Sequence, residues 1–441
     1  MTFAELNLTT PILKALNEIG FTNPTPIQEK VFSEIMSGKD VIAISQTGTG
    51  KTFAYVLPLL TQLKYSDQRH PRILIVVPTR ELVLQVAAEI EKLITYMNVR
   101  VVGIYGGTNI NTQKQKVFDG VDILVATPGR LIDIALSGEL RLKMVKTLVI
   151  DEVDEMLNLG FRAQLANILD MLPVKRQNLM FSATFSQNVE ELTATFFRET
   201  KRIGLSAHGT PLEKIIQKGY YVPNFFTKVN LLEHLLADEE FEKVLVFFGS
   251  KRLADRLHEQ LEPKFPGELC VIHSNKSQNY RINALKQFQE GTHRVLIATD
   301  IAARGLDISD ITHVINFDTP EVPIDYLHRI GRTGRADKDG TAITFINEPE
   351  RLFQAEIEKL MGKPIPIEPM PAVVQVSAIF TDEEKPFLGN KNYLKSPSAE
   401  AARSGFHEKK DKNKKTNQGG SYRRKLKAKY SKPKTRGNKP K

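Results

Sequence analysis

The stretch from Ser45 to Thr52, SQTGTGKT, decides how the rest of the chain is interpreted. The apolar run before it, residues 40–44 (DVIAI), is typical of a buried strand, and residues 53–57 (FAYVL) predict the first turns of a helix that meets Pro58. A strand, a glycine-rich turn and a helix that starts with Lys-Thr form the setting of a phosphate-binding loop. One departure from the pattern GxxxxGK[ST] is visible, because Ser45 takes the place of the first glycine.

Each residue type in this loop suits phosphate chemistry. Gly48 and Gly50 let successive backbone N–H groups point at one anion, and the start of the helix adds partial positive charge. Lys51 would reach the β- and γ-phosphates, and the Thr52 hydroxyl would bind Mg²⁺. The stretch therefore predicts ATP and Mg²⁺ as cofactors, although a glycine-rich turn that only resembles such a loop stays possible on these residues alone.

Composition indicates an ordinary soluble protein of more than one domain. The 441 residues are 41% hydrophobic and 25% charged, and no apolar run approaches the ~20 residues that span a bilayer. The start, MTFAELNLTT, does not resemble a signal peptide, and the single cysteine, Cys270, excludes an internal disulfide framework and a cysteine-based zinc cage. We expect a cytoplasmic protein without a membrane partner.

The net charge of +10 is concentrated at the carboxyl terminus. Residues 401–441 hold 16 Lys and Arg against two acidic residues, a balance of +14, so the remaining 400 residues carry −4. This distribution favours a polyanion-binding arm appended to a core of ordinary charge.

Apolar runs of strand length alternate with longer helical stretches, which indicates parallel sheets covered on both faces. The expected fold class is therefore α/β, with two domains in tandem. The predicted strands lie near 40–45, 72–77, 99–105, 122–126, 147–151 and 178–181 in the first half, and near 243–248, 269–273, 294–298, 312–317 and 341–346 in the second.

The domain limits follow from composition. The stretch Arg202 to Thr210, RIGLSAHGT, lacks periodicity and predicts the linker, and residues after about 365 become rich in Pro, Lys, Asn, Ser and Gly. We assign 1–205 to an amino-terminal domain, 206–213 to the linker, 214–370 to a carboxyl-terminal domain and 371–441 to a disordered basic tail. Only the first domain has a phosphate-binding loop, since Gly249-Ser250 after the first strand of the second half is too short to wrap a phosphate.

A metal-binding acid is expected near the loop. Asp151 and Glu152 follow the apolar run 148–150 (LVI), at the carboxyl end of a strand, where open α/β sheets bind ligands. Asp151 would hold Mg²⁺, and Glu152 would orient or deprotonate the attacking water. A strand that simply ends in surface carboxylates is the alternative, which the phosphate-binding loop makes much weaker.

Eight motifs in a fixed order give the chain a strong resemblance to the DEAD-box RNA helicases, over roughly residues 1–350. The basic tail resembles that of some bacterial members, such as the RhlE-like group. The resemblance implies two RecA-like domains. The motifs are 21–28 (FTNPTPIQ), 45–52 (SQTGTGKT), 78–82 (PTREL), 127–130 (TPGR), 151–154 (DEVD), 182–184 (SAT), 303–307 (ARGLD) and 328–335 (HRIGRTGR).

The resemblance assigns a nucleotide site that spans both domains. It implies that Gln28 and Thr25 read the adenine edge, that aromatic residues lie near the base, and that Asp307 contacts the ribose. The residues implied to bind ATP are Phe3, Phe21, Thr25, Gln28, Ser45, Gln46, Thr47, Gly48, Thr49, Gly50, Lys51, Thr52 and Asp307, with Thr52 and Asp151 as the metal ligands.

The resemblance also implies RNA contacts that ignore base sequence, because amides, hydroxyls and arginines at strand ends suit phosphates and 2′-hydroxyls. Ser182 and Thr184 are implied to link hydrolysis to duplex opening. Taken without the family, TPGR and SAT are ordinary turns. The implied RNA contacts are Pro78, Thr79, Arg80, Gly106, Gly107, Thr127, Pro128, Gly129, Arg130, Thr299, Asp300, Arg304 and Gly305.

The second domain is expected to complete catalysis. Arg332 and Arg335 would face the γ-phosphate as arginine fingers, beside the catalytic Lys51, Asp151 and Glu152, and His328 would meet the DEVD segment across the cleft. Arginines three apart are also common on a solvated helix face. Two glycines within the same eight residues argue against an ordinary helix.

Two positions depart from the family pattern. Val153 replaces alanine in the DEVD tetrad, while Asp151, Glu152 and Asp154 keep the carboxylates, so the chemistry should survive. Ser274 replaces a usual glycine in the segment that keeps Gln278 and Arg281, which puts the local RNA contact in doubt.

We therefore expect a monomeric, ATP-dependent RNA helicase that binds single strands and short duplexes and acts on ribosomal or messenger ribonucleoprotein. An RNA clamp that binds ATP and RNA without opening a duplex is the first alternative. A DNA helicase is the second, disfavoured by Gln28 and the PTPIQ run. The sequence identifies no protein partner.

Overall fold

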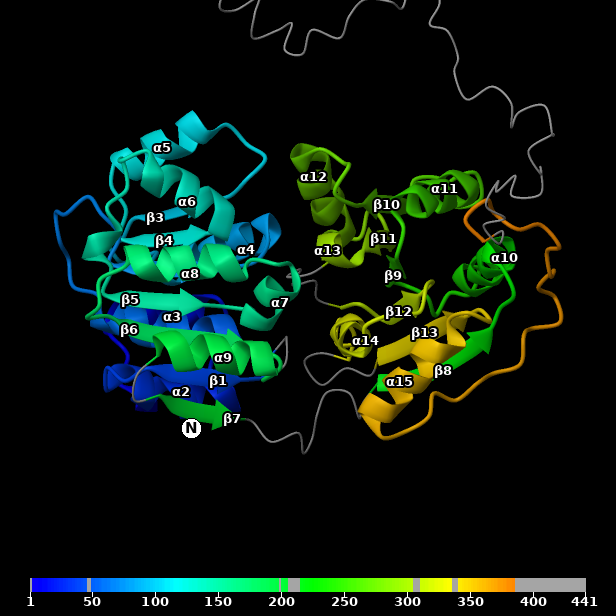
Figure 1. Cartoon of the computed structure of the whole chain (residues 1–441), viewed down its shortest axis with the longest axis horizontal. Coiled ribbons are helices and arrows are strands. Elements are labelled where there is room, and N and C mark those ends of the chain that lie inside the picture. Colours follow the sequence, from blue (N-terminus) through cyan, green and yellow to red (C-terminus); the bar gives the residue numbers. More distant parts are fainter. Residues whose placement is uncertain are drawn as a thin grey trace, which may run out of the picture. The chain divides into compact units, whose positions relative to one another are not determined.

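The computed structural model describes residues 2–45, 49–197, 200–204, 215–303, 310–334 and 340–384. They form two parallel sheets, each with helices packed on its faces (Figure 1). The predicted α/β class with two parallel-sheet domains is confirmed. We call residues 2–204 the first lobe and residues 215–384 the second lobe, and the expected disorder of the tail after 384 lies outside the described residues.

The sheet of the first lobe has the order β3-β4-β2-β5-β6-β1-β7, with parallel pairing throughout its described strands. Its strands are β1 (Val41–Ile44), β2 (Ile73–Val76), β3 (Val101–Ile104), β4 (Ile123–Ala126), β5 (Thr147–Ile150), β6 (Gln177–Ser182) and β7 (Lys201–Gly204). Its helices are η1 (Phe3–Leu6), α1 (Thr10–Glu18), α2 (Pro26–Met36), α3 (Lys51–Gln62), α4 (Arg80–Leu93), α5 (Ile110–Phe118), α6 (Pro128–Leu136), η2 (Leu142–Met144), α7 (Val153–Asn158), α8 (Arg162–Met171) and α9 (Gln187–Phe196).

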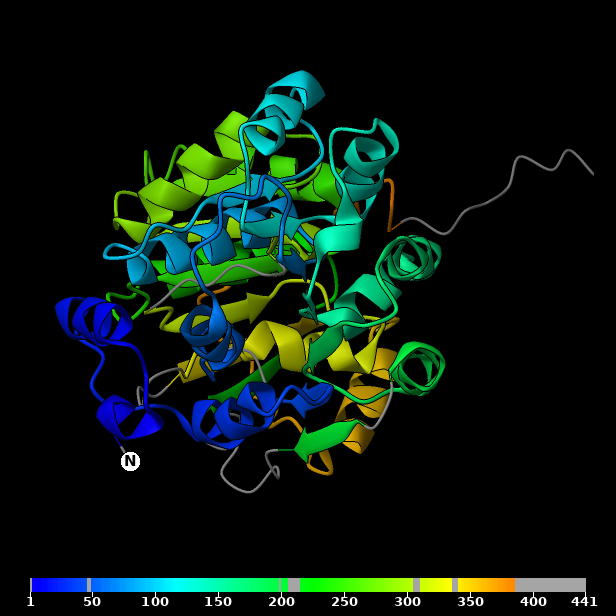
Figure 2. The same ribbon diagram turned by 90° about the vertical axis from the view of Figure 1, so that its left-hand side faces the viewer.

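Both faces of this sheet are buried, which explains why its strands are continuous apolar runs. Successive side chains of a strand point to opposite faces. Ile73 and Ile75 of β2 accordingly pack with α1 to α4, while Leu74 and Val76 pack with helices from α5 to α9. The blue amino-terminal helices of the first of these layers can be followed in Figure 2.

The sheet of the second lobe has the order β10-β11-β9-β12-β13-β8, and its described pairs are also parallel. Helices α10 and α11 pack on one face of this sheet. Helices α12 to α15 pack against the strand residues that point to the other face. The strands are β8 (Ile215–Tyr221), β9 (Val244–Phe248), β10 (Leu269–Ile272), β11 (Val295–Thr299), β12 (His313–Asn316) and β13 (Gly340–Ile346). The helices are α10 (Phe225–Leu236), α11 (Lys251–Leu261), α12 (Gln278–Gln289), α13 (Asp300–Ala303), α14 (Pro323–Ile330) and α15 (Arg351–Met361).

All strands predicted from the sequence are present, and two more appear. Strand β7 lies partly in the stretch assigned to the linker by its glycines, because its backbone pairs with β1 even though little of it is buried. Strand β8 was not predicted; it alternates buried and exposed residues and pairs with β13 along its whole length. Both segments are strands because their backbones pair with a strand that is distant in the sequence, and the local sequence does not predict such pairing.

Helix α3 continues through Pro58, where the sequence suggested a break. Proline inside a helix removes one backbone hydrogen bond, a cost of about 3 kcal/mol. The neighbouring Leu57, Leu59 and Leu60 are all buried in the first core cluster. Their burial offsets the missing bond and keeps the helix intact.

The ordered chain extends past residue 370, the boundary expected from composition. Ile367 bridges to Gly219 of β8, where a Cβ would lie 2.8 Å from the Ile367 side chain. Ser377 exchanges hydrogen bonds with Asn224 at 2.6 Å and Thr227 at 2.9 Å at the start of α10. Residues 371–384 are thus part of the second lobe's packing. Among the described residues, no helix is both long and apolar enough to cross a membrane.

Candidate nucleotide and RNA site

The phosphate-binding loop joins β1 to α3 at the carboxyl edge of the first sheet. The hydroxyls of Ser45 and Thr49 lie 2.5 Å apart and tie the two ends of the loop together, a contact that the usual glycine could not make. Gly50 has a φ of 86°, and a Cβ there would lie 2.5 Å from Nε2 of Gln28. Only glycine is free of both the strain and the clash at this position.

Lys51 begins α3 and is only 7% exposed. Its ammonium group has no hydrogen-bond partner among the residues that the structure describes. Burying a cation without a partner is costly. A phosphate bound in front of the helix would supply the missing acceptors, so the site fits a nucleotide triphosphate.

Asp151 follows β5 and is 3% exposed. Its Oδ2 accepts a hydrogen bond from the Tyr55 hydroxyl at 3.0 Å, and its Oδ1 accepts one from the Glu152 backbone at 2.9 Å. The Thr52 side chain also interacts with Tyr55 and opposes the rise in its pKa. A hydroxyl and a carboxylate therefore lie near one phenol, and such hard oxygen ligands suit Mg²⁺. The residues present fit the metal.

Tyr55 has a part in this site that sequence reasoning missed. It is fully buried, and burial together with the charge of Asp151 raises the pKa of Tyr55 well above its usual range, so it remains a donor. It lies four residues after Lys51, one helical turn along the same face. That four-residue spacing from Lys51 was the sequence signal that could have identified Tyr55 as part of the site.

Glu152 has a left-handed backbone, with φ 53° and ψ 49°, at the start of α7. A residue with a side chain persists in this region only where its surroundings fix it, at a cost of about 1–3 kcal/mol. Burial raises the pKa of Glu152, and the Lys51 ammonium opposes that rise. A carboxylate of raised pKa is a stronger base, as activation of a water molecule requires.

The residues implied to read adenine are in contact with the loop. The Gln28 side chain accepts from the Thr25 backbone at 2.9 Å and donates to the Gly50 carbonyl at 3.1 Å. Phe21 is 48% exposed and meets Phe53 edge-on, with ring centroids 5.4 Å apart, whereas Phe3 is buried in the core. An exposed ring beside the loop can pack on a base; the contacts with adenine themselves stay predictions.

Asp154 joins the DEVD tetrad to the SAT segment. Its Oδ2 accepts hydrogen bonds from the Ala183 and Thr184 backbones, at 3.1 and 2.9 Å, and from the Thr184 hydroxyl at 3.0 Å. The Ser182 hydroxyl donates to the Thr184 carbonyl at 2.6 Å. One carboxylate thus holds the turn that the resemblance assigns to coupling. The sequence showed the carboxylate but not its partners.

The predicted RNA contacts Thr79 and Arg80 start helix α4. The Thr79 hydroxyl accepts from the Leu82 backbone at 3.2 Å and caps the helix. The Arg80 guanidinium lies across Gly107, where a Cβ would stand 2.0 Å from its Nη1, and it also passes near Gly106. The two glycines therefore leave room for an arginine at the carboxyl edge of the sheet, where it can meet a phosphate. The preceding Pro78 is buried.

A second arginine on this edge is held by the protein itself. Thr127 and Pro128 begin α6, and Arg130 donates to Gln113 and to the Thr108 carbonyl, each at 3.0 Å. Gln113 was not predicted; its role appears only when α5 and α6 pack side by side. Arg130 is thus oriented before any RNA contact.

In the second lobe, Thr299 ends β11 and Asp300 begins α13. The Asp300 carboxylate accepts two hydrogen bonds from Arg329, at 2.6 and 2.7 Å. Arg329 also donates to the Asp318 carbonyl at 2.7 Å. This arginine ties two predicted motifs together, and the sequence did not single it out. An RNA contact by Asp300 stays a prediction.

Contacts also connect residues of the two lobes. His328 Nδ1 lies 3.8 Å from Glu155 Oε2, next to the DEVD tetrad, and the charge of Arg332 lowers the pKa of Glu152 against the dominant effect of burial. Glu81 accepts from Gln278 at 3.0 Å and lies 3.1 Å from Arg281. These pairs place second-lobe side chains beside first-lobe motifs.

Seven residues implied to bind nucleotide or RNA or to act in catalysis lie outside the described residues. They are Gln46, Thr47, Gly48, Arg304, Gly305, Asp307 and Arg335.

Two family models match the chain: DEAD/DEAH box helicase over residues 25–192 and helicase conserved C-terminal domain over residues 227–337. The chain is 41% identical over 350 residues to the DEAD-box ATP-dependent RNA helicase CshA of Geobacillus kaustophilus, covering 79% of this chain and 74% of that protein. It is 40% identical over 378 residues to the ATP-dependent RNA helicase RhlB of Pseudomonas syringae pv. tomato, covering 84% and 95%.

Solved structures agree with these matches. Yeast (S. cerevisiae) Dbp5 bound to RNA and ADP-BeF3 superposes with a TM-score of 0.77 at 27% identity, covering 84% of this chain and 96% of that chain. Mss116p bound to single-stranded RNA and AMP-PNP gives a TM-score of 0.77 at 30% identity, covering 84% and 78%. A closer placement in the RhlE-like group stays a prediction.

Proposed function

The chain belongs to the DEAD-box family of ATP-dependent RNA helicases, and from this premise we propose how its residues divide the work. The enzyme binds RNA independently of base sequence, and ATP hydrolysis drives the opening of short duplexes or the remodelling of ribonucleoprotein. We further propose that it acts as a monomer in the cytoplasm, where ATP and its RNA substrates meet.

The observation that carries this proposal is the buried Lys51 ammonium without a hydrogen-bond partner among the described residues. Lys51 would bind the β- and γ-phosphates, and Gln28 and Thr25 would hold the base against the same loop. A magnesium ion held by Thr52 and Asp151 would neutralise charge on the phosphate oxygens. Tyr55 keeps the Asp151 carboxylate oriented for that task.

Glu152 accepts the proton of the attacking water in this proposal. Its fixed left-handed backbone and raised pKa support a general base held in one position. Arg332 and Arg335 of the second lobe contact the γ-phosphate during closure. Through Asp154, loss of that phosphate would move the Ser182–Thr184 turn.

RNA is held by donors at the carboxyl edges of the sheets. Arg80, Arg130 and the hydroxyls of Thr79 and Thr127 suit phosphates and 2′-hydroxyls, which carry no base information. We therefore propose binding that is independent of sequence and selective for RNA through its 2′-hydroxyl.

The test is an ATPase assay with RNA and with DNA of the same sequence, followed by displacement of a short RNA duplex. We expect RNA to stimulate turnover more than DNA, and the duplex to open only with hydrolysable ATP. Equal stimulation by DNA would contradict RNA selectivity. RNA-stimulated turnover without strand displacement would instead favour an ATP-dependent RNA clamp.

A further inference from the structure

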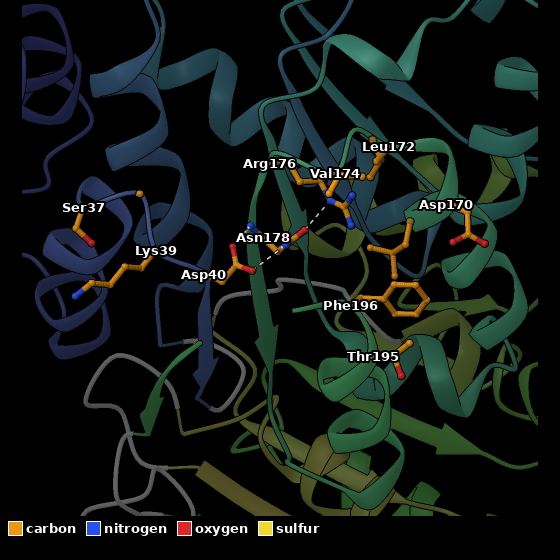
Figure 3. A pocket seen from close by; sticks show the side chains of 12 residues that line it. Ser37, Lys39, Asp40, Asp170, Leu172, Val174, Arg176, Asn178, Thr195 and Phe196 are labelled. Carbon is orange, nitrogen blue, oxygen red and sulfur yellow. Dashed lines mark hydrogen bonds between the residues drawn. The ribbon is translucent and has the colours of Figure 1, made fainter. Parts of the chain in front are cut away.

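A cavity of about 580 Å³ lies at the amino edge of the first sheet, opposite the phosphate-binding loop. It is lined by Asp40 before β1, Asn178 in β6, Leu172 after α8 and Phe196 at the end of α9 (Figure 3). Its volume is within the range of small-molecule sites. None of the residues assigned above to ATP or RNA lines it.

A polar network forms the floor of this amino-edge cavity. The two Asp40 oxygens accept hydrogen bonds from the backbone and the side chain of Asn178, at 2.7 and 2.9 Å. The Asn178 oxygen accepts from Nε of Arg176 at 2.8 Å. Asn178 therefore separates the arginine from the carboxylate, as the dashed lines in Figure 3 show.

The Arg176 guanidinium is left with unused donors. Its Nη1 donates to the Pro173 carbonyl at 2.8 Å, while its Nη2 makes no hydrogen bond to any residue that the structure describes. Burial lowers the pKa of Arg176, and the charge of Asp40 opposes this. Val174 and Phe196 line the same cavity as Arg176 and supply apolar surface (Figure 3). The guanidinium therefore keeps open donors at the cavity, and Asn178 holds its counter-charge, Asp40, out of direct contact.

We propose that this cavity binds a small organic carboxylate, which accepts hydrogen bonds from Arg176 and packs its apolar body on Phe196, Val174 and Leu172, and that this binding is coupled to ATP binding. A guanidinium and a carboxylate match in geometry, because two parallel N–H groups meet two oxygens. Lys39 and Arg176 balance the charges of Asp40 and Asp170, which also line the cavity, so the lining suits a monoanion better than a polyanion such as RNA.

The coupling follows from where the lining elements lead. Helix α2 runs from the Gln28 end to the cavity, and β1 runs from Asp40 to Ser45 of the phosphate-binding loop. Strand β6 runs from Asn178 to Ser182 of the SAT turn. Each element has one end in the cavity and the other in the nucleotide site. A ligand that shifts them changes ATP affinity, and coupled sites typically change affinity 5–150-fold.

Isothermal titration calorimetry on the full chain tests the site. The probes are 4-methylpentanoate and 3-phenylpropanoate, each beside its neutral primary amide. We expect a carboxylate to bind and its amide to bind at least about ten-fold more weakly, the loss expected for a charge-assisted hydrogen bond. If neither acid binds, or if acid and amide bind equally, the site is refuted.

Variants locate the binding. Arg176→Gln should weaken the acid at least about ten-fold, and Lys175→Gln should not, because Lys175 is exposed, carries the same charge and does not line the cavity. Val174 is 79% exposed, so Val174→Glu should leave folding intact and still repel the acid. If the acid binds both the Arg176→Gln and the Val174→Glu variant as tightly as the unchanged protein, the assignment of the acid to this cavity is refuted.

The coupling is read from the KM for ATP in RNA-stimulated turnover, with and without saturating acid. We expect a change of at least about five-fold. An unchanged KM while calorimetry still shows the acid bound refutes the coupling. Because calorimetry needs no catalysis, an inactive enzyme would count against the proposed function and leave the binding result standing.

Discussion

The two lobes each bury a lysine, but among the described residues only one of these two lysines forms a hydrogen-bonded ion pair. Lys228 of the second lobe is 2% exposed, with its ammonium 2.9 Å from Glu350 and 3.4 Å from Asp318. Lys51 of the first lobe is almost as buried and has no hydrogen-bond partner among the described residues. The same chemical group therefore serves the fold in one lobe and is available to a ligand in the other.

The starts of the corresponding helices differ in the same way. In the first lobe six residues, 45–50, separate β1 from α3, and Gly50 precedes the helix without a side chain that could cap it. In the second lobe only Gly249 and Ser250 separate β9 from α11. Ser250 caps that helix, and the Gly249 N–H donates to Asp318 at 3.0 Å. The second lobe thus uses these donors within its own fold, and the charge that it can contribute follows α14, at Arg332.

The largest expected effect tests the contribution of the second lobe to ATP hydrolysis. Arg335→Ala, and Arg332→Ala beside it, should each lower the kcat for ATP by ~10³-fold or more, as for other arginine fingers. ADP affinity should barely change, because ADP has no γ-phosphate to contact. Single-turnover kinetics and ADP titration check this, and an ADP affinity that falls in step with kcat would show a folding defect instead.

The next effect tests the base in the first lobe. Glu152→Gln should leave ATP and RNA binding intact and lower turnover ~10²–10⁴-fold, because a carboxamide cannot accept the proton. Glu91→Gln, an exposed change on α4, is the control. Turnover above about a tenth of the unmodified enzyme would contradict a general base at this position.

A third prediction compares the two buried lysines directly. Lys228→Met should lower the free energy of unfolding by about 3–5 kcal/mol, because it leaves Glu350 buried without its partner. Lys51→Met should lower that free energy by less, because the Lys51 ammonium makes no hydrogen bond to Asp151 or Glu152, although its charge lowers the pKa of both, while ATP affinity falls. Urea unfolding and nucleotide titration of both variants separate the roles. If both substitutions lowered the free energy of unfolding equally, the proposed difference between the two lysines would be wrong.

The smallest effect concerns residues 401–441, whose balance of +14 includes Tyr422 and Tyr430 between basic residues. If this segment tethers RNA, its removal should raise the KM for RNA and flatten the salt dependence of log K by ~0.7 for each lost phosphate contact. The kcat at saturating RNA should stay nearly unchanged, because the proposed catalytic residues precede residue 350. An unaltered salt slope for a 1–400 chain would exclude the tether.

Much of the fold was predictable because its signals are local. A strand buried on both faces is apolar at nearly every position, so β1 and β2 are visible as runs such as 73–76 (ILIV). The phosphate-binding loop is visible too, because glycines, lysine and threonine must follow one another in the chain. The sequence by itself therefore determined the fold class and predicted at which strand ends the functional residues lie.

Pairings between distant segments were decided only by the tertiary structure. Strand β8 is a strand because β13 lies beside it, and α3 survives Pro58 because its neighbours are buried. The hydrogen bonds of Asp154 to Thr184 and of Asp300 to Arg329 join residues about 30 positions apart. Such a contact depends on how helices and strands pack against each other, so no local sequence pattern predicts it. The positive φ of Glu152 has the same origin, since only the surrounding fold can hold a glutamate in that conformation.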